Sequence, residues 1–374
     1  MGPVASTHPF LAGKRLVLCL GPGGVGKTTC AAALSLAAAR AGRKVAVITI
    51  DPSRRLAEAL GLDRDSGRDE PVLVESCPSG GSLHASVLDP QVVFDRIVRE
   101  AAESPEQAEQ IVENPIYQAT VRHLGGALEY AAVAKVQRLA AGPYDLVVLD
   151  TPPCVNARDF LRAPDRISEI ARNPAARVLG ASGRVGGRIF GNFGAGAFAR
   201  VLGSMGGVGF LRQLGAFLRN FSSVIAAFER RADAFERILR SPATATYVVT
   251  SPLAFAVKET LAFVGELDAL RISVDAVVLN RVEPSPPPSP SREALSAWLS
   301  GEPDAPSPEE VAHLRDALAR EASLASRAER AIAAVHPRLA VVSVVRSDEP
   351  PSARTALADL GERLGRRLGA QAAS

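Results

Sequence analysis

The stretch Leu18–Cys30, which reads LCLGPGGVGKTTC, indicates the fold of this chain. Residues Gly21–Thr28 match the pattern G-x-x-x-x-G-K-[ST], in which glycines let successive backbone N–H groups point at phosphate oxygens. A short apolar run, Arg15–Leu20, precedes the loop, and the alanine-rich run Thr28–Ala41 follows it with the composition of a helix. The sequence therefore predicts a phosphate-binding loop between a first strand and a first helix, whose N-terminus adds its dipole.

The residues of this loop have separate expected roles. Lys27 would reach the β- and γ-phosphates as a catalytic cation, and the Thr28 hydroxyl would ligate Mg²⁺. The other expected nucleotide contacts come from the neighbouring positions Gly23, Gly24, Val25, Gly26 and Thr29. The pattern thus implies ATP and Mg²⁺ as cofactors.

Further apolar runs follow along the chain, each short, rich in β-branched residues and without alternation, which is typical of strands buried on both faces. They are Lys44–Ile50, Tyr144–Asp150, Ala245–Thr250, Ser273–Asn280 and Leu339–Val345, with Leu83–Leu88 as an additional candidate. Helical patterns separate them, at Gln91–Glu100, Tyr117–Ala140, Leu253–Leu270, Pro308–Ala334 and Ser352–Leu368. This alternation, together with the loop, predicts an α/β fold of the P-loop NTPase type, with a mostly parallel sheet wrapped by helices.

One P-loop ATPase domain over residues 1–374 is the expected organisation, because no internal repeat suggests a second nucleotide site. The segment 283–291 (EPSPPPSPS) is nearly all Pro and Ser and predicts an extended loop.

Composition and charge argue against several other functions. The formal net charge of +3 over 374 residues gives no general attraction to nucleic acid. Met1–Gly13 lacks the features of a signal peptide, and no apolar run reaches the roughly 18 residues of a membrane span. We therefore expect a cytoplasmic location, with peripheral membrane contact as an alternative. The four cysteines form no C-x-x-C pair, so no zinc site is expected.

Four motifs in order carry a resemblance to a known family. They are GGVGKTT at 23–29, TIDP at 49–52, DTPP at 150–153 and the strand-terminal Asn280. This set resembles the deviant Walker A ATPases, and among them the family of the arsenical-pump ATPase and the ATPase that targets tail-anchored membrane proteins. The resemblance covers about residues 14–282 and 338–368. It implies a Mg²⁺-dependent ATPase that works as a nucleotide-driven dimer switch.

The resemblance also implies roles for individual residues. Asp51 lies at the switch I position and would orient or activate the attacking water. Asp150 matches the switch II aspartate and would hold Mg²⁺ through water, and Asn280 matches the residue that hydrogen-bonds adenine. The loop Arg346–Pro351 would close over the base through its backbone. Each of these residues could instead serve only as a turn or strand-end residue.

Pro22 departs from the family pattern, because the family carries a lysine here that crosses the dimer interface to the partner's nucleotide. Proline offers neither charge nor a backbone N–H. Three outcomes follow: another cation such as Arg54 or Arg55 takes over, hydrolysis is slow and the protein acts as a switch, or the partner is a related, lysine-bearing ATPase. Both a homodimer and such a heterodimer are therefore expected as possible assemblies.

The switch II region departs as well, since Asn156 stands where the targeting ATPases have a histidine. The three-thiol arsenite site of the pump ATPase has no counterpart. Cys19 falls in a buried strand and Cys30 in the first helix, so only Cys154 has a position that could be functional.

Residues 170–228 contain no Asp or Glu. The segment instead carries arginines among apolar residues and glycines, at Arg172, Arg177, Arg184, Arg188, Arg200, Arg212 and Arg219. In the resembled family this region belongs to an inserted helical subdomain that responds to nucleotide. The resemblance implies such a subdomain here at about residues 90–140 and 160–240. An apolar segment with a basic fringe suits a hydrophobic protein client or an anionic membrane surface, and an ordinary helical lid is the alternative.

The C-terminal run has a leucine stripe at Leu357, Leu360, Leu364 and Leu368, which either covers the sheet or contacts a membrane. Membrane contact would fit a positioning ATPase of the MinD/ParA type. Besides a self-sufficient ATPase, the sequence also admits a weakly hydrolysing partner of a lysine-bearing paralogue and a metalloid-pump subunit.

Overall fold

The computed structural model describes residues 11–50, 55–61, 67–68, 70–123, 127–153, 160–162, 227, 229–287, 290–299, 306–346 and 354–372. Several predicted features lie outside these ranges. They are Asp51, Arg54, Cys154, Asn156, most of the segment 170–228 and the loop after Arg346. The description that follows concerns the remaining residues, which include the phosphate-binding loop and eight strands.

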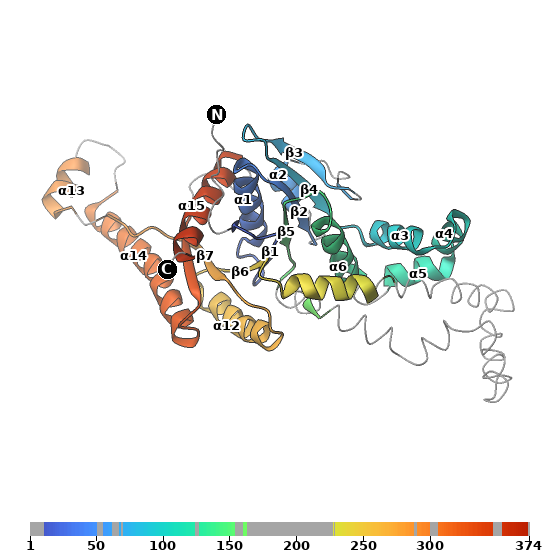
Figure 1. Ribbon diagram of the computed structural model, residues 1–374. Coiled ribbons are helices and arrows are strands. Elements are labelled where there is room, and N and C mark those ends of the chain that lie inside the picture. The colour runs from blue at the N-terminus through green and yellow to red at the C-terminus, as the bar shows by residue number, and fades with distance from the viewer. Residues whose placement is uncertain are drawn as a thin grey trace.

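The described strands form one eight-stranded sheet in the order β3-β4-β2-β5-β1-β6-β7-β8 (Figure 1). Their bounds are β1 Leu16–Leu20, β2 Lys44–Thr49, β3 Val72–Ser76, β4 Ser82–Val87, β5 Leu146–Asp150, β6 Thr244–Thr250, β7 Ala276–Val282 and β8 Ala340–Val345. All neighbours pair in parallel except β3, which runs antiparallel to β4 at one edge. The predicted α/β class with a mostly parallel sheet is confirmed.

The centre of the sheet holds the strand that precedes the phosphate-binding loop. β1 lies between β5 and β6, and every residue of β1 and β5 is buried, as are all but the first residue of β2. Parallel strands end at the same edge of a sheet, so the ends of β1, β2 and β5 bring their last residues together. Cys19 and Thr49 both pair with Asp150 in this register.

Helices cover both faces of the sheet (Figure 1). Their bounds are α1 Lys27–Arg40, α2 Arg55–Leu60, α3 Pro90–Ala101, α4 Pro105–Val112, α5 Pro115–His123, α6 Ala127–Ala140, α12 Ala254–Ala269, α13 Arg292–Leu299, α14 Pro308–Val335 and α15 Arg354–Ala372, with a further helix over 229–239. Alternate residues of β1 face opposite layers. Val17 packs with the side chains of α1, α2 and α15, whereas Leu18 packs with those of α3, α6, the helix 229–239 and α12.

The last helix lies directly on the first. Among the leucines of the predicted stripe, Leu357 and Leu364 are fully buried, and Leu360 and Leu368 nearly so. Gly361 permits the close approach, because a Cβ there would lie 2.4 Å from the carbonyl oxygen of Ala33 on α1. The stripe therefore belongs to the core, and the membrane-contact interpretation of this helix is not supported.

The structure differs from the predicted elements in several places. Within the pattern Tyr117–Ala140 the structure describes two helices, α5 and α6, and residues 124–126 between them lie outside the described residues. The strand predicted over Ser273–Asn280 begins later and extends to Val282. The edge strand β3 was not predicted, because its residues are only partly buried and lack a continuous apolar run.

In the part of the chain that the structure describes, no helix combines the length and the hydropathy needed to cross a lipid bilayer. The N-terminal half of the long helix α14 extends past the sheet, and α13 packs against α14 at that end (Figure 1).

Candidate active site

The loop between β1 and α1 has the backbone conformation that its glycines allow. Gly21, Gly24 and Gly26 all have positive φ, a region that favours glycine. A Cβ on Gly21 would lie 2.0 Å from the carbonyl oxygen of Val249, and one on Gly26 would lie 2.3 Å from Nδ2 of Asn280. Gly23 and Gly24 are exposed at the tip, and a Cβ on Gly24 would meet no atom within 4 Å. The base of the loop is therefore tightly packed, while its tip is accessible to a ligand.

The first turn of α1 is arranged for an anion. Its N-cap is Gly26 in a left-handed conformation, and within the described residues no side chain caps this helix end or places an acid in its first turn. A helix start normally has its free N–H groups satisfied by a Ser, Thr, Asp or Asn cap. Here no side chain of the described residues caps the positive end of the helix dipole, which favours phosphate oxygens.

Lys27 is held at the mouth of the loop. Its side chain is buried, and Nζ donates a hydrogen bond to the carbonyl oxygen of Pro22 at 2.7 Å. Pro22 is itself buried and contributes this carbonyl although it lacks an N–H. The loop thus orients its own lysine across the tip, where it would meet the β- and γ-phosphates.

The carboxylate of Asp150, at the end of β5, accepts hydrogen bonds from two threonine hydroxyls. Oδ2 of this fully buried carboxylate accepts hydrogen bonds from Thr28 Oγ1 at 2.9 Å and from Thr49 Oγ1 at 3.0 Å. Thr28 is the first-turn residue that the sequence assigns to Mg²⁺, and Thr49 ends β2. Sequence reasoning did not single out Thr49, although a threonine at the end of a buried strand beside the TIDP motif is a signal that could have done so.

The Thr151 hydroxyl adds a further anchor by donating to the carbonyl oxygen of Cys19 at 2.8 Å. This bond ties the chain after β5 to the end of β1. The two strands that carry the loop and the carboxylate are therefore fixed to each other where the site lies.

The donor set fits a hard divalent cation. A threonine hydroxyl and a carboxylate meet at the start of α1, and oxygen ligands of this kind suit Mg²⁺, which commonly keeps waters and substrate phosphates as its other ligands. Within the described ranges, no group of three or more His, Cys, Asp or Glu side chains could hold a metal ion. Thr28 and Asp150 would hold Mg²⁺ together with the nucleotide phosphates.

Asn280 lies against the phosphate-binding loop. Its Nδ2 donates to the carbonyl oxygen of Val25 at 2.9 Å, and the side chain is buried. β7 continues past Asn280 with a shift of register against β8 between Leu279 and Val282, and Arg281 takes a positive φ of 60°. This irregularity turns Asn280 toward the loop, whereas its contact with adenine stays a prediction.

An Asn280→Ala variant distinguishes the two roles of this residue. Since the observed bond supports the loop backbone, we expect affinity to fall by about fivefold to 100-fold for ATP and GTP alike. The measurement is a titration of both nucleotides into wild type and variant. A selective loss for ATP, with GTP binding unchanged, would instead assign Asn280 to base recognition.

Two of the cysteines lie beside the site but within the core. Cys19 on β1 and Cys30 on α1 are fully buried. Burial raises the pKa of both thiols, to about 12 for Cys30, and the negative charge of Asp150 adds to the effect. Both therefore remain protonated at neutral pH and are poor ligands for a metalloid, which requires a thiolate.

These features define a class of protein. A central parallel strand leads into a glycine loop, an uncapped helix follows, and Lys27, Thr28 and Asp150 lie together at the carboxyl edge of the sheet. This is the arrangement of a P-loop nucleotide hydrolase.

Comparison with known proteins gives the family. The family model described as anion-transporting ATPase matches residues 14–302, which is well over half of the chain. The chain therefore belongs to the anion-transporting ATPase family, and it is an enzyme of the ATPase class.

Individual relatives agree with this assignment. ATPase BagA of Mycobacterium tuberculosis is 22% identical over 293 residues, which span 74% of this chain and 67% of that protein. ATPase ARSA2 of Chlamydomonas reinhardtii is 26% identical over 270 residues, with 70% and 66% covered. ATPase GET3C of Arabidopsis thaliana is 27% identical over 169 residues, with 41% and 42% covered.

Proposed function

We propose that this protein is a Mg²⁺-dependent ATPase in which ATP binding and hydrolysis drive a dimer switch. The observation that carries the proposal is the meeting of Lys27, Thr28 and Asp150 at the edge of the sheet. Bound Mg²⁺ would neutralise charge on the phosphates. The chain supplies the loop N–H groups and the Lys27 ammonium, which stabilise the charge that develops during phosphoryl transfer.

Asp51 is our candidate for the residue that orients the attacking water. It follows Thr49 by two positions, and both the Thr49 hydroxyl and the Ile50 N–H are bound to Asp150. The chain therefore leaves β2 from a point fixed beside the metal-binding carboxylate. A carboxylate starting from that point suits in-line attack of water on the γ-phosphate.

Pro22 favours a second candidate function. Without a lysine at this position, a symmetric dimer would lack the cation that the family presents to the partner's nucleotide. We therefore consider a weakly hydrolysing ATPase that pairs with a related, lysine-bearing subunit. In that arrangement, the partner would supply the missing cation to the site built by Lys27 and Asp150.

The client of the switch is defined only by its chemistry. The arginines among apolar residues in the segment 170–228 suit a hydrophobic protein segment or an anionic membrane surface. The helix 229–239, which follows this segment, packs in the same layer as α3 and α6. A client bound there would therefore act on the helical layer rather than on the sheet directly.

A metalloid-pump subunit and a membrane-positioning ATPase have less support from the structure. Capture of arsenite needs exposed thiolates, and burial keeps Cys19 and Cys30 as neutral thiols. Positioning on a membrane through the C-terminus needs a free apolar stripe, and the leucines of α15 pack against α1.

The proposed function and the role of Pro22 are tested together by phosphate release and by molecular mass in solution. We expect Mg²⁺-dependent phosphate release from ATP, and a dimer favoured by a non-hydrolysable ATP analogue over ADP. We also expect Pro22→Lys to raise kcat tenfold or more, because a cation supplied across an interface accelerates phosphoryl transfer by up to about 10⁵-fold in related enzymes.

The control for this experiment is Pro22→Ala, which removes the ring without adding a charge. An increase in both variants would show that the proline backbone, and not the missing cation, limits turnover. Phosphate release that is independent of Mg²⁺ and of Lys27 would overturn the proposed ATPase itself.

A further inference from the structure

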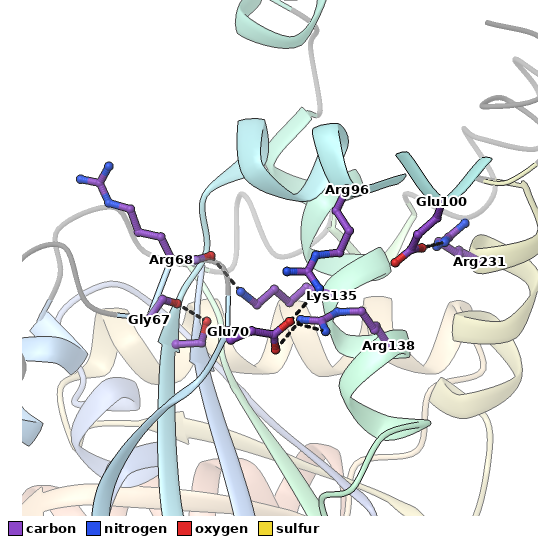
Figure 2. Close-up of polar contacts among 9 residues, drawn as sticks. Gly67, Arg68, Glu70, Arg96, Glu100, Lys135, Arg138 and Arg231 are labelled. Atoms are coloured by element: carbon purple, nitrogen blue, oxygen red, sulfur yellow. Dashed lines mark hydrogen bonds and ion pairs between the residues drawn. The ribbon is translucent and has the colours of Figure 1, made fainter. Parts of the chain in front are cut away.

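The chain between β2 and β3 leaves the active site at one end and is tied to the helical layer at the other. At its start, Thr49 Oγ1 and the Ile50 N–H are bound to Asp150, at 3.0 Å and 3.1 Å. At its end, Gly67 is bound to the last residues of β4, and Arg68 and Glu70 are bound to side chains of the helical layer (Figure 2). The two ends of this segment are therefore fixed to different parts of the molecule.

Hydrogen bonds to its backbone carbonyls fix the returning end. The carbonyl oxygen of Gly67 accepts from Ser86 Oγ at 2.5 Å and from the Val87 N–H at 3.2 Å. The carbonyl oxygen of Arg68 accepts from Lys135 Nζ on α6 at 3.0 Å. Lys135 is only 2% exposed, and a buried ammonium is costly unless such partners satisfy it.

Glu70 joins the same end to two helices. Its Oε1 accepts from Arg96 on α3 at 2.6 Å and from Arg138 on α6 at 2.9 Å, and its Oε2 accepts from Arg138 at 3.2 Å (Figure 2). Burial alone would raise the pKa of Glu70, but the hydrogen bonds and charges of Arg138 and Arg96 outweigh it and lower the pKa. The carboxylate is thus ionised at neutral pH and binds both helices at once.

A second ion pair extends this network toward the arginine-rich segment. Glu100, near the end of α3, pairs with Arg231 of the helix 229–239 (Figure 2). Arg231 also donates to the carbonyl oxygen of Ala227 at 3.1 Å. Glu100, Arg231, Arg96, Lys135 and Arg138 all border one small cavity between the helices. The network therefore runs from the end of the connection between β2 and β3, through α3 and α6, to the helix 229–239, which follows residues 170–228.

We propose that Glu70, through Arg96 and Arg138, is a positioning residue that couples the helical layer to the hydrolytic step. A shift of α3 or α6 would act on Glu70, at one end of the connection between β2 and β3, while the other end of this connection is bound to Asp150 through Thr49 and Ile50. Conversely, nucleotide at the loop would bias the placement of the helix 229–239. This inference rests on the proposed ATPase function and names the residues that would couple the helical layer to hydrolysis.

The test compares Glu70→Gln with the matched control Glu75→Gln. Glu75 lies on β3 and pairs with Arg40 at the far end of α1, at 3.1 Å, away from the site. Both substitutions keep the size of the side chain and remove one charge of an ion pair at the surface. We expect Glu70→Gln to lower kcat by roughly three- to tenfold with KM for ATP unchanged, within the range by which coupling residues act, and Glu75→Gln to change neither.

A second measurement tests the coupling between the nucleotide site and the helix 229–239 in the absence of hydrolysis. Amide hydrogen exchange over residues 229–239 is compared with and without a non-hydrolysable ATP analogue. We expect a change in exchange in the wild type that is lost in Glu70→Gln and kept in Glu75→Gln. A double exchange, Glu70→Arg with Arg138→Glu, keeps the charge balance beside Arg96 and is expected to restore part of the lost kcat.

The outcomes separate the inference from the function on which it rests. Equal kcat and equal exchange in Glu70→Gln and wild type would overturn the coupling role while leaving the ATPase intact. A wild type that neither releases phosphate nor responds to the analogue would overturn the ATPase function instead. A lower melting temperature together with a raised KM in Glu70→Gln would show a merely structural role and also contradict the inference.

Discussion

Lys27→Ala is expected to lower kcat/KM for ATP by about 10²–10³-fold, because it removes a preorganised cation from the phosphates. The side chain is buried at the loop mouth, where Nζ bonds to the Pro22 carbonyl oxygen at 2.7 Å. Without the ammonium, the loop N–H groups alone face the charge of the triphosphate. Steady-state phosphate release, together with direct titration of a fluorescent ATP analogue, measures the effect.

The control for this substitution is Lys258→Ala, at an exposed position on α12. We expect the control to leave turnover and binding unchanged, since one surface charge contributes little. A melting curve of Lys27→Ala shows whether the fold is retained. Wild-type binding and turnover in a folded Lys27→Ala protein would contradict the assignment of this loop as the ATP site.

Asp150→Asn is the second substitution for which we expect a large loss. The amide keeps the shape of the carboxylate and can still accept hydrogen bonds from Thr28 and Thr49, but it loses the charge that attracts Mg²⁺. We expect kcat to fall by about 10²-fold or more, in line with the loss of a key electrostatic group. Nucleotide binding measured in EDTA should remain, while its enhancement by Mg²⁺ should disappear.

Thr49→Val and Thr49→Ser supply the comparison for Asp150. Valine removes the hydroxyl that orients the carboxylate and keeps the charge, so we expect a weaker Mg²⁺ dependence and a smaller loss than in Asp150→Asn. Serine restores the donor and should restore the response to Mg²⁺. If Asp150→Asn kept the Mg²⁺ dependence of the wild type, the carboxylate would not be the metal-binding group.

The strands were the most predictable part of the fold. β1 and β5 are covered on both faces, and nearly every position in them carries an apolar side chain. In β6, which is also buried, the residues other than Ala and Val are three threonines and one tyrosine. β3 could not be recognised in this way, because it is an edge strand with a partly exposed face. The pattern Tyr117–Ala140 predicted helix for residues that the structure describes as α5 and α6.

The candidate site was predictable where a motif lies within one stretch of chain. Lys27 and Thr28 belong to the loop pattern, and the end of β5 indicates Asp150 by its acid after an apolar run. The bond between Asn280 and Val25 joins residues far apart in sequence, and its existence depends on the register of β7 and on the turn at Arg281. No local pattern encodes such a contact, and the same holds for the hydrogen bond between Thr49 and Asp150.

The ion pairs of Glu70 show the same limit in the helical layer. Glu70 lies in the connection before β3, whereas Arg96 and Arg138 lie on two helices, and charged residues of these types are common on any protein surface. Only the packing of α3 and α6 beside the end of β4 brings them together. Asp51 stays a prediction that rests on the TIDP motif, because it lies outside the described residues.

The central position of β1 has a consequence for how this protein is made. Leu16 pairs with Val147 on one side and with Thr244 on the other, so the strand that leads into the loop is completed by neighbours from the middle and the later part of the chain. Such long-range parallel pairing gives a high contact order and slow folding. During synthesis, the loop is translated early but stays without its sheet until Thr250 has left the ribosome, and the apolar strands are open to aggregation in that interval.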